Sequence, residues 1–105
     1  MDTQESFAPQ PKSTRQVATG TGNGVLAMPL GNQVRLLARG ADCRVEFGKD
    51  ATVSATAPVA GGAAGSMLLK AGIAQIFTVP ANTAFVAFAT DTGAGTLEAS
   101  PGIGI

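Results

Sequence analysis

The stretch CRVEF at positions 43–47 shows the cleanest alternation of apolar and polar residues in the chain. Successive side chains of a β-strand point to opposite faces, so its apolar residues would face a core and its charged residues would face away from it. The preceding stretch QVRLLAR (33–39) alternates in the same way. The GAD turn at 40–42 joins the two stretches, which predicts two half-buried strands in succession.

Short apolar runs continue along the chain from Thr14 onward, separated by clusters of Gly, Pro, Asn and Asp. No window carries the i, i+3, i+4, i+7 apolar pattern of a helix free of Gly or Pro. Strands at intervals of about 8–12 residues with Gly/Pro turns predict an all-β sandwich or barrel. The further strand candidates are TRQVAT (14–19), VLAMPL (25–30), ATVSATA (51–57), MLLKAG (67–72), AQIFTVP (74–80), TAFVAFAT (83–90) and TLEAS (96–100).

The run TAFVAFAT (83–90) is apolar on both faces. Such a strand lies between two sheets or between a sheet and another subunit. The alternative is a core strand with one face covered by a loop. The longest irregular segment, PVAGGAAGS (58–66), is too rich in Gly for a helix and too short for a linker between domains.

The first segment, MDTQESFAPQPKS (1–13), contains one large apolar side chain besides Met1, namely Phe7. It cannot bury enough surface to offset the entropy of ordering. We therefore expect an extended N-terminal arm over residues 1–13, laid along a neighbour through Phe7 or left as a plain tail. The β-sandwich domain would occupy residues 14–105.

The composition narrows the class of protein. The 105 residues include no His, Trp or Tyr, and His is the side chain that enzymes use most often for proton transfer. Seven basic residues balance seven acidic residues, and charged residues make up 13% of the chain, against about 25% in an ordinary domain. A basic stripe for nucleic acid is not expected from this balance. So little charge at zero net charge favours association, which predicts a homo-oligomer, a dimer or a trimer.

Neither a membrane segment nor a secretion signal is expected. No stretch approaches the roughly 20 apolar residues of a membrane helix, and the beginning of the chain lacks the charged-then-apolar order of a signal peptide. Cys43 is the single cysteine, so the sequence predicts no internal disulfide and no metal spacing, and Cys43 is interpreted as a small buried apolar residue.

Sequence motifs that could support catalysis or ligand binding are weak in this chain. The carboxylates occupy turns or alternating strands without any catalytic spacing, and Asp-Thr-Gly at 91–93 occurs without the full flanks of an aspartic protease. TGTGNG (19–24) is followed by no helix, because VLAMPL contains a proline, so a turn is favoured over a phosphate loop. The serines have no His to activate them. We predict no enzyme, and no catalytic, cofactor or metal-binding residues.

Three arginines on the alternating strands are the remaining candidates: Arg35, Arg39 and Arg44. They could form a basic patch on adjacent strands. The favoured interpretations are pairing with Asp42 and Glu46 across the hairpin, or anchoring of a contact between subunits. Together with Phe7 they are the predicted partner-contact residues.

The second half of the chain, residues 68–105, resembles a group of small virion proteins of tailed bacteriophages. The resemblance is carried by Gly turns and Pro-terminated strands, and the strand pair VRLLARG…CRVEFG (34–48) is similar to the first half of that group. The matching residues are Ala71-Gly72, Phe77-Thr78-Val79-Pro80, Gly93-Ala94-Gly95-Thr96-Leu97 and Ser100-Pro101-Gly102.

The resemblance covers about residues 25–105 and implies a small β-sandwich, jelly-roll-like, of about eight strands. It implies a capsid decoration (cement) protein that is made in the host cytoplasm and binds the outer capsid surface of the virion. Its partner would be the major capsid protein, whose subunits it would bridge. The alternatives are a tail, head-fibre or head–tail junction component, or a carbohydrate-binding module, although the Trp and Tyr that stack on sugars are missing.

Overall fold

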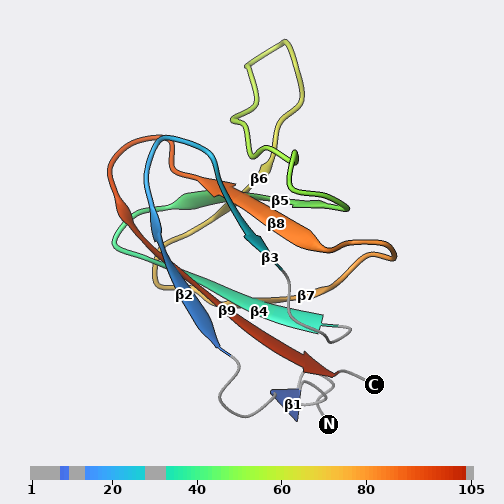
Figure 1. Ribbon diagram of the computed structural model, residues 1–105. Helices are drawn as coiled ribbons and strands as arrows, with labels where there is room; N and C mark the ends of the chain where they lie inside the picture. The colour runs from blue at the N-terminus through green and yellow to red at the C-terminus, as the bar shows by residue number, and fades with distance from the viewer. Residues whose placement is uncertain (1–7, 10–13, 28–32, 104–105) are drawn as a thin grey trace, which may run out of the picture.

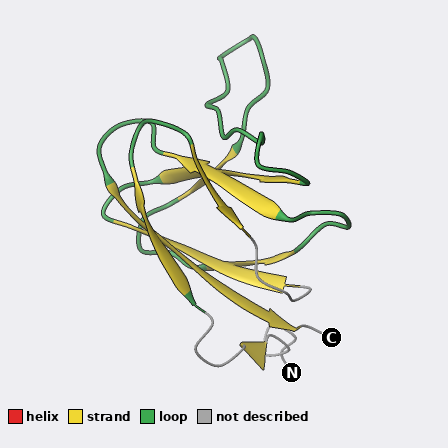
Figure 2. Ribbon diagram, in the orientation of Figure 1, coloured by secondary structure: helices red, strands yellow, loops and turns green. Residues whose placement is uncertain are grey.

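Two antiparallel β-sheets face each other across a common core in the computed structural model, which describes residues 8–9, 14–27 and 33–103 (Figures 1 and 2). The predicted all-β class is confirmed, because the described residues contain no helix. The strands are β1 (Ala8–Pro9), β2 (Arg15–Thr19), β3 (Gly24–Ala27), β4 (Gln33–Arg39), β5 (Cys43–Gly48), β6 (Met67–Leu69), β7 (Gln75–Thr78), β8 (Phe85–Ala89) and β9 (Gly95–Ile103).

The topology is that of a jelly roll, as predicted. The first half of the chain pairs with the second as in one long hairpin, joining β2 to β9, β3 to β8, β4 to β7 and β5 to β6. Wrapping this ribbon adds the pairs β4–β9 and β5–β8. The result is a five-stranded sheet in the order β1-β9-β4-β7, with β2 also on β9, and a four-stranded sheet in the order β3-β8-β5-β6.

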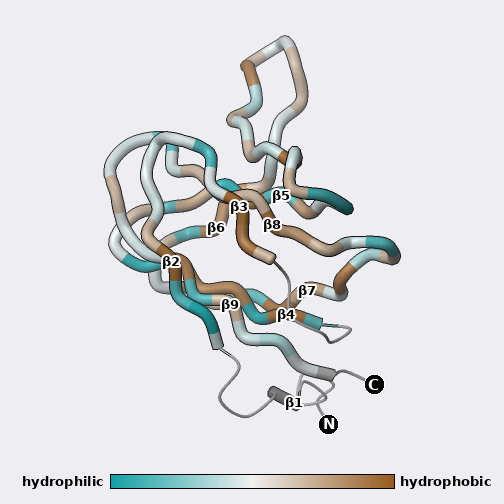
Figure 3. Tube along the Cα trace, in the orientation of Figure 1, coloured by the Kyte–Doolittle hydropathy of each residue, from teal (hydrophilic) through white to brown (hydrophobic). Residues whose placement is uncertain are grey.

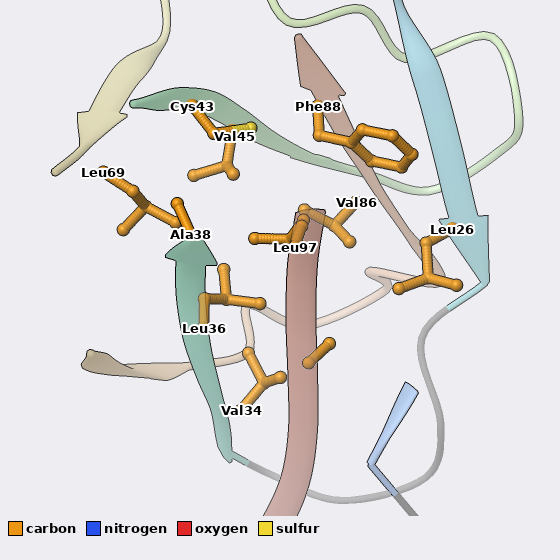
Figure 4. Close-up of a cluster of buried hydrophobic side chains, with 11 residues drawn as sticks. Leu26, Val34, Leu36, Ala38, Cys43, Val45, Leu69, Val86, Phe88 and Leu97 are labelled. Atoms are coloured by element: carbon orange, nitrogen blue, oxygen red, sulfur yellow. The ribbon is translucent and has the colours of Figure 1, made fainter. Parts of the chain in front are cut away.

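The alternation in QVRLLAR (33–39) and CRVEF (43–47) determines which of their side chains enter the core. QVRLLAR coincides with β4, and CRVEF is β5 with Gly48 added. Their alternate residues are fully or nearly fully buried except Phe47, which is partly buried, and they meet those of β8, β9 and β6 between the sheets (Figure 4). The cluster comprises Leu26, Val34, Leu36, Ala38, Cys43, Val45, Leu69, Val86, Phe88, Leu97 and Ala99. Burying each Leu or Val stabilises the fold by about 1.5–3 kcal/mol.

A second, smaller cluster lies on the outer face of β8. Ala87 and Ala89 are buried there against Ala55, with Val25 and Val53 packed beside them. The segment that follows β5 therefore covers one face of this strand. Of the two interpretations of TAFVAFAT, the core strand with a loop over one face is the correct one.

The prediction of a strand at 51–57 is wrong, because backbone groups of this segment form hydrogen bonds with a side chain and not with a neighbouring strand. The four-stranded sheet already pairs β5 with β8 on one side and β6 on the other, so β5 has no free ladder edge. Instead, the amide of Ala55 donates to Oδ1 of Asn23 at 2.7 Å, and Nδ2 of Asn23 donates to the carbonyl of Val53 at 3.3 Å. One side-chain amide thereby takes the place of a neighbouring strand.

Strand β9 runs further than predicted, beyond Ser100 through Pro101. Proline removes a ladder donor and is rare in central strands. On one side Pro101 lies opposite Val34 of β4. On the other side, within the described residues, β2 pairs with β9 as far as Ala99 and β1 pairs with it from Gly102. Among the described pairs, Pro101 therefore falls between those with β2 and those with β1.

Candidate interaction surfaces

A short hairpin, which we call the finger (residues 56–66), projects from the four-stranded sheet (Figure 1). At its base the amide of Ser66 donates to the carbonyl of Thr56 at 2.6 Å. Nearer the tip, the amide of Val59 donates to the carbonyl of Ala63 at 2.9 Å, and that of Gly62 donates back to Val59, also at 2.9 Å. The glycines of 58–66 predict an irregular segment. These backbone hydrogen bonds give that segment a defined structure.

Charged side chains of the four-stranded sheet anchor the base of the finger. Ser66 is buried, and its hydroxyl donates to Oε1 of Glu46 at 2.9 Å while accepting the amide of Thr56 at 3.0 Å. Nη1 of Arg44 donates to the carbonyl of Ser66 at 3.1 Å. The finger is therefore held by two strand side chains that would otherwise face solvent.

The finger has an uncharged, exposed surface. Its residues 56–65, TAPVAGGAAG, are all exposed, and Val59 near the tip is 61% exposed. In the hydropathy colouring of Figure 3 it appears in pale and brown shades. Contiguous exposed apolar surface is a candidate for contact with another protein, and Val59 is the large apolar side chain that the finger offers. Sequence reasoning missed this site, although a signal was present: Lys70 is the single charged residue between Ala51 and Thr90.

A cleft of about 520 Å³ lies at the end of the sandwich, lined by the turns 40–42 and 91–94 together with Leu68 and Ala71. Its two carboxylates already have partners. Asp42 accepts the amide of Ala71 at 2.8 Å and pairs with Nζ of Lys70 at 3.2 Å.

The second carboxylate, Asp91, takes two bonds from Arg44, at 3.2 Å from Nε and 3.0 Å from Nη2. Among the described residues no group of three or more His, Cys, Asp or Glu is placed to hold a metal ion. Both carboxylates that line the cleft are thus paired with basic side chains of the same chain.

The predicted pairing of arginines with Asp42 and Glu46 is wrong. Arg39 pairs with Glu98 at 3.0 Å, because β4 lies beside β9 in the sheet. Arg44 lies opposite Ala89, two residues before Asp91, so the register brings Arg44 to that carboxylate instead.

The three arginines also do not form one patch. Arg35 and Arg39 alternate with buried residues of β4 and face outward from the five-stranded sheet. Arg44 faces outward from the other sheet, toward the finger and the end cleft. Phe7, the remaining predicted contact, lies outside the described residues. Cys43 is fully buried, as predicted, and burial raises the pKa of its thiol.

We expect stability to be flat between about pH 6 and 8, because the chain has no His and the thiol of Cys43 titrates above that range. The backbone amide of Ala71, then Lys70, lowers the pKa of Asp42, and hydrogen bonds from Arg44 lower that of Asp91. A carboxyl whose pKa is lower in the folded state adds stability above its unfolded pKa, and this stability is lost as pH falls through the folded value. Thermal midpoints should therefore decline only below about pH 4. A steep change near pH 7 would contradict this.

No helix among the described residues is long and apolar enough to cross a membrane. No protein-family model, curated protein or solved structure matches the chain.

Proposed function

We propose that this protein is a structural virion protein, a capsid decoration protein that binds the outer surface of a tailed-phage head. The observation that carries the proposal is the finger, an exposed and uncharged projection anchored at its base by Ser66, Glu46 and Arg44. The jelly-roll topology and the resemblance of residues 25–105 to small phage virion proteins support it.

The proposed mechanism is mechanical. A finger whose base is already ordered loses little conformational entropy on docking, so the apolar area that it buries contributes directly to binding. Seated where major capsid subunits meet, it would add buried surface across a junction that internal pressure pulls apart. Each copy would thereby raise the force or temperature at which the head opens.

The test is co-sedimentation with emptied heads of the phage that carries this gene. We expect the wild-type protein to sediment with heads and Val59→Glu to bind about tenfold more weakly or worse, because a charge at the tip must be desolvated on docking. Ser54→Glu is the matched control, since Ser54 is also exposed but precedes the finger, and it should bind like the wild type. Decorated heads should burst at a higher temperature than bare heads.

Absence of wild-type binding to heads would overturn the decoration proposal. Binding to purified tails in the same assay would support the alternative of a tail or head–tail junction component. Equal binding by Val59→Glu would remove the finger from the mechanism and leave the sheets as the docking surface.

The end cleft is the feature that favours the alternative of a carbohydrate-binding module, because jelly rolls commonly serve as lectin domains. Its lining offers no aromatic ring for a sugar, and Asp42 and Asp91 are occupied by Lys70 and Arg44. The finger is thus the stronger basis for a function.

A further inference from the structure

Two strands that follow each other in the chain, β6 and β7, each form an outer edge of one of the two sheets. Strand β7 (Gln75–Thr78) is the last strand of the five-stranded sheet and pairs with β4 alone among the described strands. Strand β6 (Met67–Leu69) is the last strand of the four-stranded sheet and pairs with β5 alone among them. Each therefore presents one row of backbone donors and acceptors without a strand partner.

This pair of edges lacks the usual protection against association. Exposed edge strands normally carry charges or proline, or are covered by another element. Here Met67 of β6 and Ile76 of β7 are 45% and 42% exposed, and Ile73, in the connection between the two strands, is 56% exposed. The nearby charges are Lys70, which pairs with Asp42, and Arg35, which lies directly opposite Ile76 on the inner neighbour β4 and not on the edge itself.

The opposite edge of the five-stranded sheet is different. Its outer strands are β2, which begins with the exposed Arg15, and β1, which ends with Pro9. A charged residue such as lysine or arginine, or a proline, on an edge strand discourages the addition of a further strand. Only the β7 edge of this sheet is left suited to receive another strand.

We infer that β7 pairs with β7 of a second copy of this chain, antiparallel and about a two-fold axis at Ile76. In an antiparallel pair, residues directly opposite each other lie on the same face of the sheet. Ile76 would then lie opposite Ile76 of the partner subunit. The two five-stranded sheets would become one continuous sheet.

A second copy fits this edge for two reasons. An antiparallel pair of identical strands is self-complementary, so the contact closes as a dimer and leaves neither copy's β7 edge free. A different protein would be selected mainly by charge complementarity, and the chain from Ala71 to Thr90 offers none. The formal net charge is zero, so two copies do not repel each other.

The test is the mass of the isolated protein in solution, measured by light scattering after gel filtration over a dilution series. We expect a species of twice the 10.4 kDa chain mass for the wild type. Ile76→Lys places two like charges opposite each other and should raise the dimer dissociation constant about tenfold or more. Ala18→Lys is the matched control, because Ala18 is an exposed residue of the opposite edge strand, and it should remain dimeric.

A covalent readout keeps the inference testable should Ile76→Lys fail to fold. Ile76→Cys should form a disulfide-linked dimer on mild oxidation, whereas Ala18→Cys should not, and Cys43 is buried and does not compete. A monomeric wild type at every concentration, or an Ile76→Lys variant that dimerises like the wild type, would overturn the inference. Because no heads are present, either result is independent of the decoration proposal.

Discussion

Replacing Gly95 by alanine is expected to lower the free energy of unfolding by about 3 kcal/mol or more. A β-carbon on Gly95 would collide with the carbonyl oxygen of Arg39 and lie 2.9 Å from the amide nitrogen of Ala41. Both obstacles are backbone atoms, so no side chain can rotate away. Relief requires the beginning of β9 to separate from the end of β4, where the two central strands of the five-stranded sheet pair.

Gly22→Ala is the control for Gly95→Ala, because nothing lies within 4 Å of a β-carbon at Gly22. Chemical denaturation of both variants would measure the difference. We expect Gly22→Ala to stay within about 0.5 kcal/mol of the wild type. A Gly95→Ala variant as stable as the wild type would mean that the approach of β9 to the 39–41 turn is looser than described.

Replacing Leu36 by alanine should lower the free energy of unfolding by about 2–5 kcal/mol, because it leaves a cavity at the centre of the core. Leu36 is fully buried on β4, between the two sheets (Figure 4). For a domain near 100 residues each kcal/mol shifts the thermal midpoint by about 4–8 °C. The midpoint should therefore fall by about 10 °C or more.

Leu37→Ala makes the same chemical change one residue further along the same strand. Leu37 points to the outer face and is only partly buried, so its loss should cost about 1 kcal/mol or less. Calorimetry of the two variants compares the faces of β4 directly. Equal destabilisation by Leu36→Ala and Leu37→Ala would mean that the outer face is also covered, which is the behaviour expected if a partner lies over it.

Local pattern determined the strands and the direction in which their side chains point. The alternation in 33–39 and 43–47 specified β4 and β5 and their buried faces, because the period of two is a property of the strand itself. Turn residues every few positions specified the all-β class. The composition of residues 51–57 also suits a strand, but the prediction of one was wrong because both edges of β5 are already paired.

Which distant residues contact each other was decided only by the tertiary structure. Arg44 meets Asp91, and Asn23 meets Val53 and Ala55, because strand register places them together across 30 or more positions of sequence. The finger owes its defined base to Glu46 and Arg44, which hold Ser66 across the fold. A sequence pattern records which face a residue occupies, whereas pairing is selected by the free energy of the whole sheet, and no local period encodes it.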